Sequence, residues 1–282
     1  MILKSDIKNA LYIIATPIGN MQDITFRAIE ILKKCDIILC ETPRNSINLL
    51  NFYDITSKKL SCYNDHSTQI DREKILKQIS QGKVIALISD AGTPLISDPG
   101  YKLIDYLRQF NIKIIPIPGA SSLTSAICAS GIACDNFTFL GFLPKNKNKR
   151  IELINKNINN TFIFFESPKS IIKTLKEIEQ ISPIRKCCIA REITKIYEEI
   201  YTDQINEIIT KIENNKIKAK GEFVVILEKS SAENKITQSE IIAELKKLKR
   251  KKMSLRDIVE LISQKNNITK KEIYKIAIDN LW

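Results

Sequence analysis

The chain has 282 residues, of which 44% are hydrophobic, so it is long enough for one large domain or two ordinary domains with sizeable cores. No apolar run is long enough to span a bilayer, and the short apolar segment near the start is not a signal peptide, so we expect a soluble, cytoplasmic protein without a membrane partner. The net charge of +12 favours a nucleic-acid partner only weakly, because lysine is frequent throughout the chain.

Histidine and cysteine usage limits the possible chemistry further. The single histidine, His66, excludes mechanisms that need two imidazoles. The seven cysteines are odd in number and contain no Cys-x-x-Cys pair, so they predict neither a disulfide framework nor a metal site. We expect them to be small apolar side chains in a reducing compartment.

Short apolar segments alternate with helical periodicity over the first 119 residues. Apolar strands separated by helices are typical of a parallel sheet that is covered on both faces. We expect Gly82 to end the second helix and the prolines after residue 115 to shorten the last strand. The expected strands are 11–15, 36–41, 84–89 and 113–119, and the expected helices are 24–35, 72–82 and 101–110.

A second α/β series begins near Pro118-Gly119. Its apolar segments predict a mixed sheet, and we expect the first domain to span 1–118 and the second to span 119–232. The expected strands are 137–143, 161–167, 187–192 and 222–229, and the expected helices are 121–131 and 170–181.

The last fifty residues differ in character from both series. Three capping-box signatures each precede an amphipathic stretch of about three turns. We therefore expect a three-helix appendage over 233–282, connected by a linker at 230–235. The capping pairs are Thr237 with Glu240, Ser254 with Asp257, and Thr269 with Glu272.

Small and polar residues gather where the expected strands end, which is where open parallel sheets bind ligands. In "SDAGTP" (89–94), Asp90 supplies an acceptor, Thr93 a hydroxyl, and Gly92 a close approach to the backbone. The nearby "SDPG" (97–100) predicts only an ordinary turn before a helix. Comparable segments are "ATPIGN" (15–20), "ETPRNS" (41–46), "IPGASS" (117–122), "FFESP" (164–168), "ARE" (190–192) and "KGE" (220–222).

Several common nucleotide and hydrolase motifs are missing from these segments. The sequence contains no G-x-G-x-x-G fingerprint and no G-x-x-x-x-G-K-[ST] loop, which argues against dinucleotide binding and nucleotide hydrolysis. It also contains no G-x-S-x-G elbow, which weakens a hydrolase interpretation.

The combination of motifs resembles the tetrapyrrole-methylase-like family of S-adenosylmethionine-dependent enzymes. The resemblance implies two α/β domains of the tetrapyrrole-methylase type, with the donor site in the cleft between them, and a homodimer. Within the family, it implies methyl transfer to the ribose 2′-hydroxyl of a cytidine in the decoding region of 16S rRNA, with the small ribosomal subunit as partner. The segments that carry it are "LYIIATPIGNMQDITFRAIEIL" (11–32), "SDAGTPLISDPG" (89–100), "PIPGASS" (116–122), "GFLPK" (141–145), "FFESP" (164–168) and "AREITKIYEEI" (190–200).

The same resemblance implies which residues contact the S-adenosylmethionine donor. The donor carries an ammonium, a carboxylate, an adenine and a sulfonium, so it needs backbone donors, carboxylates and apolar walls. The implied contacts are Ile18, Asp90, Gly92, Thr93, Ser121, Ser122, Phe165, Ala190, Gly221 and Glu222.

Methyl transfer to a hydroxyl also needs a base within hydrogen-bond reach. The candidates are Glu41, His66, Glu166 and Glu192, and our first choice is Glu41, with Arg44 gripping a phosphate. Each candidate also has a purely structural interpretation. Glu41 could form an ion pair with Arg44, and Glu192 one with Arg191. His66 could cap a helix near Asp71, and Glu166 could accept backbone hydrogen bonds at the turn before Pro168.

Two basic runs offer a track for RNA phosphates. We expect "PKNKNKR" (144–150) to be an exposed loop and "KKLKRKK" (246–252) to lie between the first two tail helices. The three-helix tail as a whole resembles a helix-turn-helix module, which favours RNA docking. Two alternatives stay open at this point. One is an enzyme of the same fold that methylates a tetrapyrrole or a protein side chain, and the other is a non-catalytic RNA-binding assembly factor.

Overall fold

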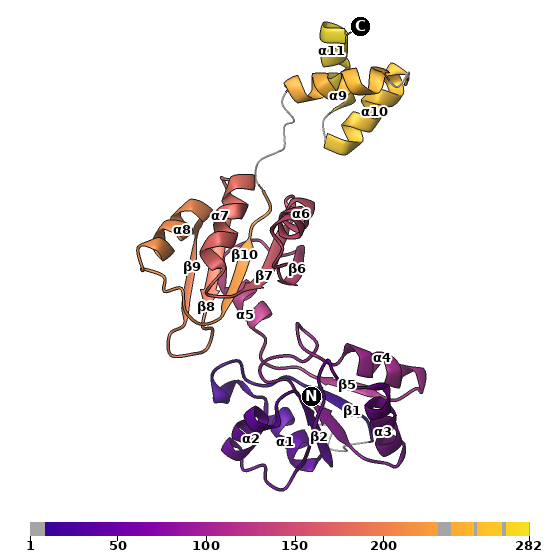
Figure 1. The fold of residues 1–282 in the computed structure, drawn as a ribbon, viewed down its shortest axis with the longest axis vertical. Coiled ribbons are helices and arrows are strands. Elements are labelled where there is room, and N and C mark those ends of the chain that lie inside the picture. The colour runs from indigo at the N-terminus through magenta and orange to yellow at the C-terminus, as the bar shows by residue number, and fades with distance from the viewer. Residues whose placement is uncertain (1–8, 231–237, 251–252, 267–268, 282) are drawn as a thin grey trace, which may run out of the picture. The chain divides into compact units, whose positions relative to one another are not determined.

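The computed structural model describes residues 9–230, 238–250, 253–266 and 269–281. The chain divides into two compact units, Met1–Lys229 and Ser230–Trp282. The first unit contains two five-stranded sheets and the second contains three helices, which confirms the expected α/β class with a helical appendage (Figure 1). No helix in the described residues is long and apolar enough to cross a bilayer.

The first sheet is entirely parallel, with strand order β3-β2-β4-β1-β5. Its central strands are buried on both faces, as the apolar segments predict. The helices α1 and α2 cover one face, and α3 and α4 cover the other. The elements are β1 Leu11–Ile14, α1 Phe26–Lys34, β2 Ile37–Cys40, α2 Pro43–Phe52, β3 Lys59–Cys62, α3 Gln69–Ser80, β4 Ile85–Leu87, α4 Tyr101–Gln109 and β5 Ile114–Ile117, with a short 3-10 helix at Met21–Asp23.

The second sheet is mixed, with strand order β6-β7-β10-β8-β9, in which only β6 and β7 pair in parallel. The helices α6, α7 and α8 cover one face. The opposite face packs against α5 and against Ile18, which comes from the loop after β1. The elements are α5 Ser122–Ala129, β6 Phe137–Phe142, α6 Lys147–Asn157, β7 Thr161–Glu166, α7 Ile171–Ile181, β8 Lys186–Arg191, β9 Glu199–Gln204, α8 Ile205–Glu213 and β10 Phe223–Leu227.

The strand β5 ends at Ile117, directly before Pro118, so it is shortened as expected, but Pro116 lies inside it. The strand tolerates it because β5 is at the edge of the first sheet, where one row of backbone N–H groups has no strand partner. Besides the short 3-10 helix, five elements were not predicted. They are α2, β3, α6, β9 and α8, and most of them are rich in polar residues.

The basic segment 144–150 is not the exposed loop that we expected. The helix α6 begins at Lys147, and the Asn146 side chain accepts a hydrogen bond from the Lys149 backbone N–H. Arg150 is buried, because its guanidinium bonds both carboxylate oxygens of Glu177 at 2.7 and 2.9 Å. Of the basic residues in this segment, the three lysines before Arg150 remain exposed.

The C-terminal unit has a core of its own, formed by apolar residues of all three helices. Its helices are α9 Gln238–Arg250, α10 Leu255–Asn266 and α11 Lys270–Leu281. The capping pairs at Ser254 and Thr269 are confirmed by hydrogen bonds to Asp257 and Glu272. The pair that begins at Thr237 lies outside the described residues, as does most of the expected linker.

The basic run 246–252 also differs from expectation. Residues 246–250 form the last turns of α9 rather than a connection between helices, and 251–252 lie outside the described residues. Lys246, Lys247 and Lys249 are exposed on this helix.

Candidate active site

Two loops of the first sheet are joined at the carboxyl ends of β1 and β4. The backbone of Thr16 exchanges two hydrogen bonds with that of Gly92, at 2.9 and 3.0 Å. Gly92 has a φ of +75°, and a Cβ there would lie 3.2 Å from the Ile18 Cγ2 atom. Glycine therefore allows both the left-handed turn and the close approach of these loops.

These loops border a cavity of about 370 Å³ that also reaches the second sheet. This volume lies within the usual range for small-molecule sites. Its walls come from the loops after β1, β4, β5, β7 and β8, from the end of β6 and from the turn before β10. The lining residues are Ile18, Ala91, Gly92, Thr93, Ile96, Ser97, Asp98, Ser121, Ser122, Phe142, Phe165, Glu166, Ser167, Pro168, Ala190, Ile193, Gly221, Glu222, Phe223 and Val224.

Nine of the ten donor residues implied by the sequence line this cavity; their role in binding the donor stays a prediction. Asp90 is the exception. Its carboxylate accepts hydrogen bonds from the Thr42 backbone N–H at 3.2 Å and from Asn45 Nδ2 at 2.7 Å, at the start of α2. The structure thus places Asp90 beside the cavity wall rather than in it.

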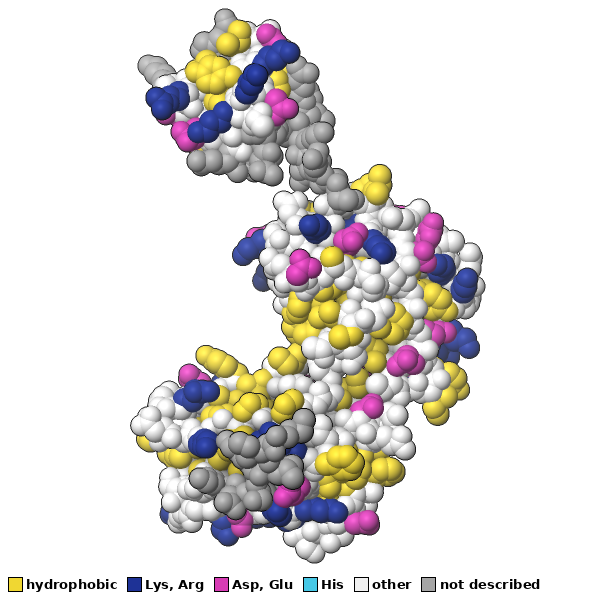
Figure 2. Space-filling view, turned by 180° about the vertical axis from the view of Figure 1, so that it is seen from behind, with side chains coloured by type: hydrophobic (Ala, Val, Ile, Leu, Met, Phe, Trp, Pro, Cys, Tyr) yellow, Lys and Arg dark blue, Asp and Glu magenta, His cyan; other side chains and the backbone are white. Residues whose placement is uncertain are grey.

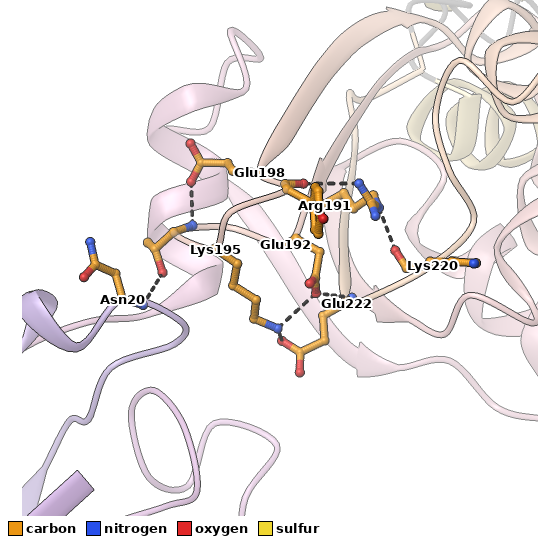
Figure 3. A network of polar contacts seen from close by, with 9 residues as sticks. Asn20, Arg191, Glu192, Lys195, Glu198, Lys220 and Glu222 are labelled. Carbon is orange, nitrogen blue, oxygen red and sulfur yellow. Dashed lines mark hydrogen bonds and ion pairs between the residues drawn. The ribbon is translucent and has the colours of Figure 1, made fainter. Parts of the chain in front are cut away.

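A polar network holds the turn before β10 in place (Figure 3). Glu192 accepts a hydrogen bond from the Glu222 backbone N–H at 2.9 Å. Lys195 bridges the Glu192 and Glu222 carboxylates, with both Nζ–O distances at 3.0 Å. Glu192 does not pair with Arg191, as its structural interpretation expected, because Arg191 is bound to Glu199 at 2.9 Å.

The network also reaches the loop after β1, because the Asn20 backbone N–H donates to Thr194 Oγ1 at 3.2 Å. The loops that carry the predicted donor contacts from both sheets are therefore held together by polar bonds.

Asp98 is a cavity residue that the sequence did not single out. Burial raises the pKa of its carboxyl to about 6, and the nearby Glu41 and Asp90 carboxylates contribute to this rise. We expected the segment around it to be an ordinary turn. The only signal in the sequence was a second Ser-Asp pair soon after "SDAGTP".

The candidate bases Glu41, His66 and Glu166 and the phosphate-binding candidate Arg44 lie in different places. Glu166 lines the cavity, but its two oxygens accept hydrogen bonds from the Ser167 backbone N–H and the Thr174 hydroxyl, both at 2.7 Å. Glu41, Arg44 and His66 do not line the cavity. Arg44 is exposed in the first turn of α2, and His66 is exposed in the loop before α3.

Glu41 differs from Glu166 in its bonding. No hydrogen bond or ion pair joins its carboxylate to another described residue, Arg44 included. Burial, together with the Asp90 and Asp65 carboxylates, raises the pKa of Glu41. Glu41 is therefore the carboxylate with free acceptor oxygens, whereas the oxygens of Glu166 are already engaged.

The fold of the sheet unit is that of a known class of methyltransferases. The structure of uroporphyrin-III C-methyltransferase from Thermus thermophilus, complexed with S-adenosylhomocysteine, superposes with a TM-score of 0.54 at 12% identity, covering 78% of this chain and 98% of that one. The sequence model of the tetrapyrrole (corrin/porphyrin) methylases matches residues 10–209. The chain belongs to this family, which confirms the resemblance seen in the motifs.

Relatives within the family extend the similarity to the C-terminal unit. The chain is 45% identical to ribosomal RNA small subunit methyltransferase I of Rickettsia prowazekii, over 96% of this chain and 97% of that protein. It is 39% identical to the protein of the same name from Buchnera aphidicola, over 95% and 96% of the two chains. The similarity therefore includes the three-helix unit as well as both sheets.

Asp98 leads to a prediction about pH. A cationic ligand in the cavity favours the charged form of this carboxyl and lowers its pKa from about 6. Binding of the predicted donor in this cavity should therefore release a proton at low pH, so we expect the donor affinity to rise as the pH increases from 5 to 7, by up to about tenfold per pH unit below 6. Titration calorimetry at several pH values measures this change.

The control for this prediction is Asp98→Asn. This variant should bind the donor more weakly than the unmodified protein and show a flat affinity over the same pH range. A pH dependence that persists in Asp98→Asn would assign the titration to another group.

Proposed function

We propose that this protein transfers the methyl group of S-adenosylmethionine to the ribose 2′-hydroxyl of a cytidine in the decoding region of 16S rRNA. The observation that carries this proposal is the similarity to ribosomal RNA small subunit methyltransferase I over nearly the whole length of both chains. The cavity supports it, because most of the residues implied to bind the donor line one continuous space.

The cavity residues fit the chemistry of the donor. The Asp98 and Glu222 carboxylates suit its cationic groups, and Phe165 and Ala190 provide apolar walls for its adenine. Bound in the cavity, the donor supplies a methyl group that is already activated as a sulfonium. The protein's own task is then to position the acceptor hydroxyl, exclude water and accept one proton.

We assign the proton-accepting role to Glu41. The carboxylate takes the proton from the 2′-hydroxyl as the oxygen–carbon bond forms and the carbon–sulfur bond breaks. Its raised pKa brings it closer to neutral pH than an ordinary glutamate, and a base works best when its pKa is close to the working pH. Arg44, exposed three residues later, can grip a phosphate of the same RNA with two parallel hydrogen bonds.

The C-terminal unit supplies a basic surface for the RNA. On α11, Lys271, Tyr274, Lys275 and Ile278 are exposed at helical spacings that place them on one face. Figure 2 shows hydrophobic side chains of this unit with Lys and Arg side chains, and some Asp and Glu side chains, around them. A positive face of this kind suits the phosphate backbone of RNA.

The salt dependence of binding tests this surface. Replacing both Lys271 and Lys275 with Gln should lower the slope of log affinity against log salt by about 0.7 for each lost phosphate contact with single-stranded RNA. The matched control is Lys270→Gln, because the Lys270 ammonium is already bound to Glu260 at 2.8 Å. An unchanged slope in the double variant would remove α11 from the RNA-binding surface.

The experiment that tests the function itself is transfer of tritiated methyl groups to small subunits from a strain that lacks the modification. We expect label in 16S rRNA at a ribose 2′-oxygen. Label in a ribosomal protein, or methylation of a porphyrinoid in a parallel assay, would favour the other substrates of this fold. Donor binding without any methyl transfer would favour a non-catalytic assembly factor.

The assembly and location form part of the same proposal. The resemblance implies a homodimer, which sedimentation of the purified protein tests directly. Because the proposed substrate is the small ribosomal subunit, we also place the protein in the cytoplasm.

A further inference from the structure

Two large hydrophobic side chains line the cavity and yet stay open to solvent. Phe142 is 64% exposed and Ile96 is 40% exposed, and both belong to the cavity wall. Among the exposed large hydrophobic residues of the described chain, only these two line the cavity. They therefore mark its opening, where a second ligand can meet the donor.

A β-bulge turns Phe142 toward this opening. The pairing of β6 with β7 runs from Phe137 opposite Thr161 to Phe139 opposite Ile163, and it resumes with Phe142 opposite Phe165. Two residues of β6 thus occupy the place of one, and Gly141 adopts a φ of +61° within the irregularity. Without the bulge, the Phe142 side chain would point to the opposite face of the sheet, which α6 and α7 cover.

The surroundings of the ring suit a flat, anionic ligand. Phe142 contacts Phe165 edge-to-face, with the ring centroids 5.6 Å apart, so one side of the ring is supported from within the cavity. Across the opening, a Cβ at Gly141 would lie 3.4 Å from Ser97 Oγ, which places the bulge against the loop that carries Ile96. The exposed Lys145, Lys147 and Lys149 lie a few residues after Phe142 in the chain.

We propose that Phe142 and Ile96 form the binding subsite for the base of the nucleotide that is methylated, with the base stacked on the Phe142 ring. This inference rests on the proposed function. An exposed aromatic side chain beside lysines is the usual means by which proteins hold an unpaired base next to its phosphates. Stacking the base at the opening directs the attached ribose toward the donor cavity.

The donor's own adenine is a poorer occupant for this subsite. The cavity contains a more enclosed aromatic wall at Phe165, which is already among the residues implied to bind the donor. Phe142 lies at the open end, where the RNA arrives. If the RNA base stacks on Phe142, a substitution there lowers methyl transfer but not donor affinity. If the donor's adenine stacks on it, the same substitution lowers donor affinity, and the test below uses this difference.

The test compares Phe142→Leu and Phe142→Tyr with the control Phe137→Leu. Phe137 lies on the same strand and is 37% exposed but does not line the cavity. For methylation of small subunits, we expect Phe142→Leu to lower kcat/KM by about 5- to 100-fold, the effect of losing one base–aromatic stack. Phe142→Tyr should retain most of the activity, and Phe137→Leu should retain all of it.

Calorimetry and sedimentation on the same variants complete the test. The affinity for S-adenosylmethionine and the oligomeric state should be unchanged in Phe142→Leu. A matching loss of donor affinity would assign the ring to the donor site, and a change of oligomeric state would assign it to contact with a second copy. Either result, or a normal kcat/KM in Phe142→Leu, would overturn the proposal that Phe142 binds the base. If the unmodified protein does not methylate small subunits at all, the proposed function is overturned instead.

Discussion

Glu41→Gln should lower the turnover number by roughly 10²- to 10⁴-fold, the usual contribution of a positioned base. Glutamine keeps the size of the side chain but cannot take up the proton of the 2′-hydroxyl. Donor affinity should change little, because Glu41 does not line the cavity. The measurement is the rate of tritiated methyl transfer to small subunits at saturating donor and RNA.

The pH profile adds a second readout for Glu41. Burial and neighbouring carboxylates raise its pKa, so protonation should remove the base, and the rate, at a higher pH than for an ordinary glutamate. The acid limb of the profile should therefore be present in the unmodified enzyme and lost in the residual activity of Glu41→Gln. Near-normal turnover in Glu41→Gln would rule this residue out, and Glu166→Gln and His66→Gln would then be compared in the same assay.

Gly92→Val should raise the dissociation constant for S-adenosylmethionine by about 100-fold or more. Already the first atom of a side chain would lie 3.2 Å from Ile18 Cγ2, and two further methyl groups would have to fit beside the cavity. The φ of +75° adds strain for a branched residue. Titration calorimetry on the folded variant measures the loss.

The matched control for this variant is Gly131→Val. Gly131 has a similar φ of +62°, but nothing lies within 4 Å of a Cβ built there. The control therefore carries the backbone strain without the steric conflict near the cavity. We expect Gly131→Val to lose some stability and to bind the donor normally, and an equal loss of affinity in both variants would mean that strain alone, and not the position of Gly92, weakens binding.

The sequence by itself determined the architecture and the composition of the donor loops. Period and apolarity are local properties, so the buried strands β1, β2 and β4 and the helices α1, α3 and α4 could be placed without coordinates. Loops after parallel strands converge at one edge of a sheet, so the strand-end motifs already pointed to a common site. The resemblance of these motifs to one family added the identity of the methyl donor.

The tertiary structure alone decided which polar and aromatic groups reach that site. Arg150 looked like part of an exposed basic run, but Glu177 on α7 removes it from solvent. Asp98 looked like a turn residue, but the neighbouring loops bury it beside Glu41 and Asp90 and raise its pKa. Burial and ion pairing depend on residues that are distant in the chain, so local sequence patterns cannot predict them.

Phe142 shows the same limit most clearly. Strict alternation along β6 would direct its ring to the face covered by α6 and α7. A single bulge at Gly141 reverses this direction and brings the ring to the opening of the cavity. The register of β6 against β7 is a property of the folded sheet, so only the structure reveals which face the ring occupies.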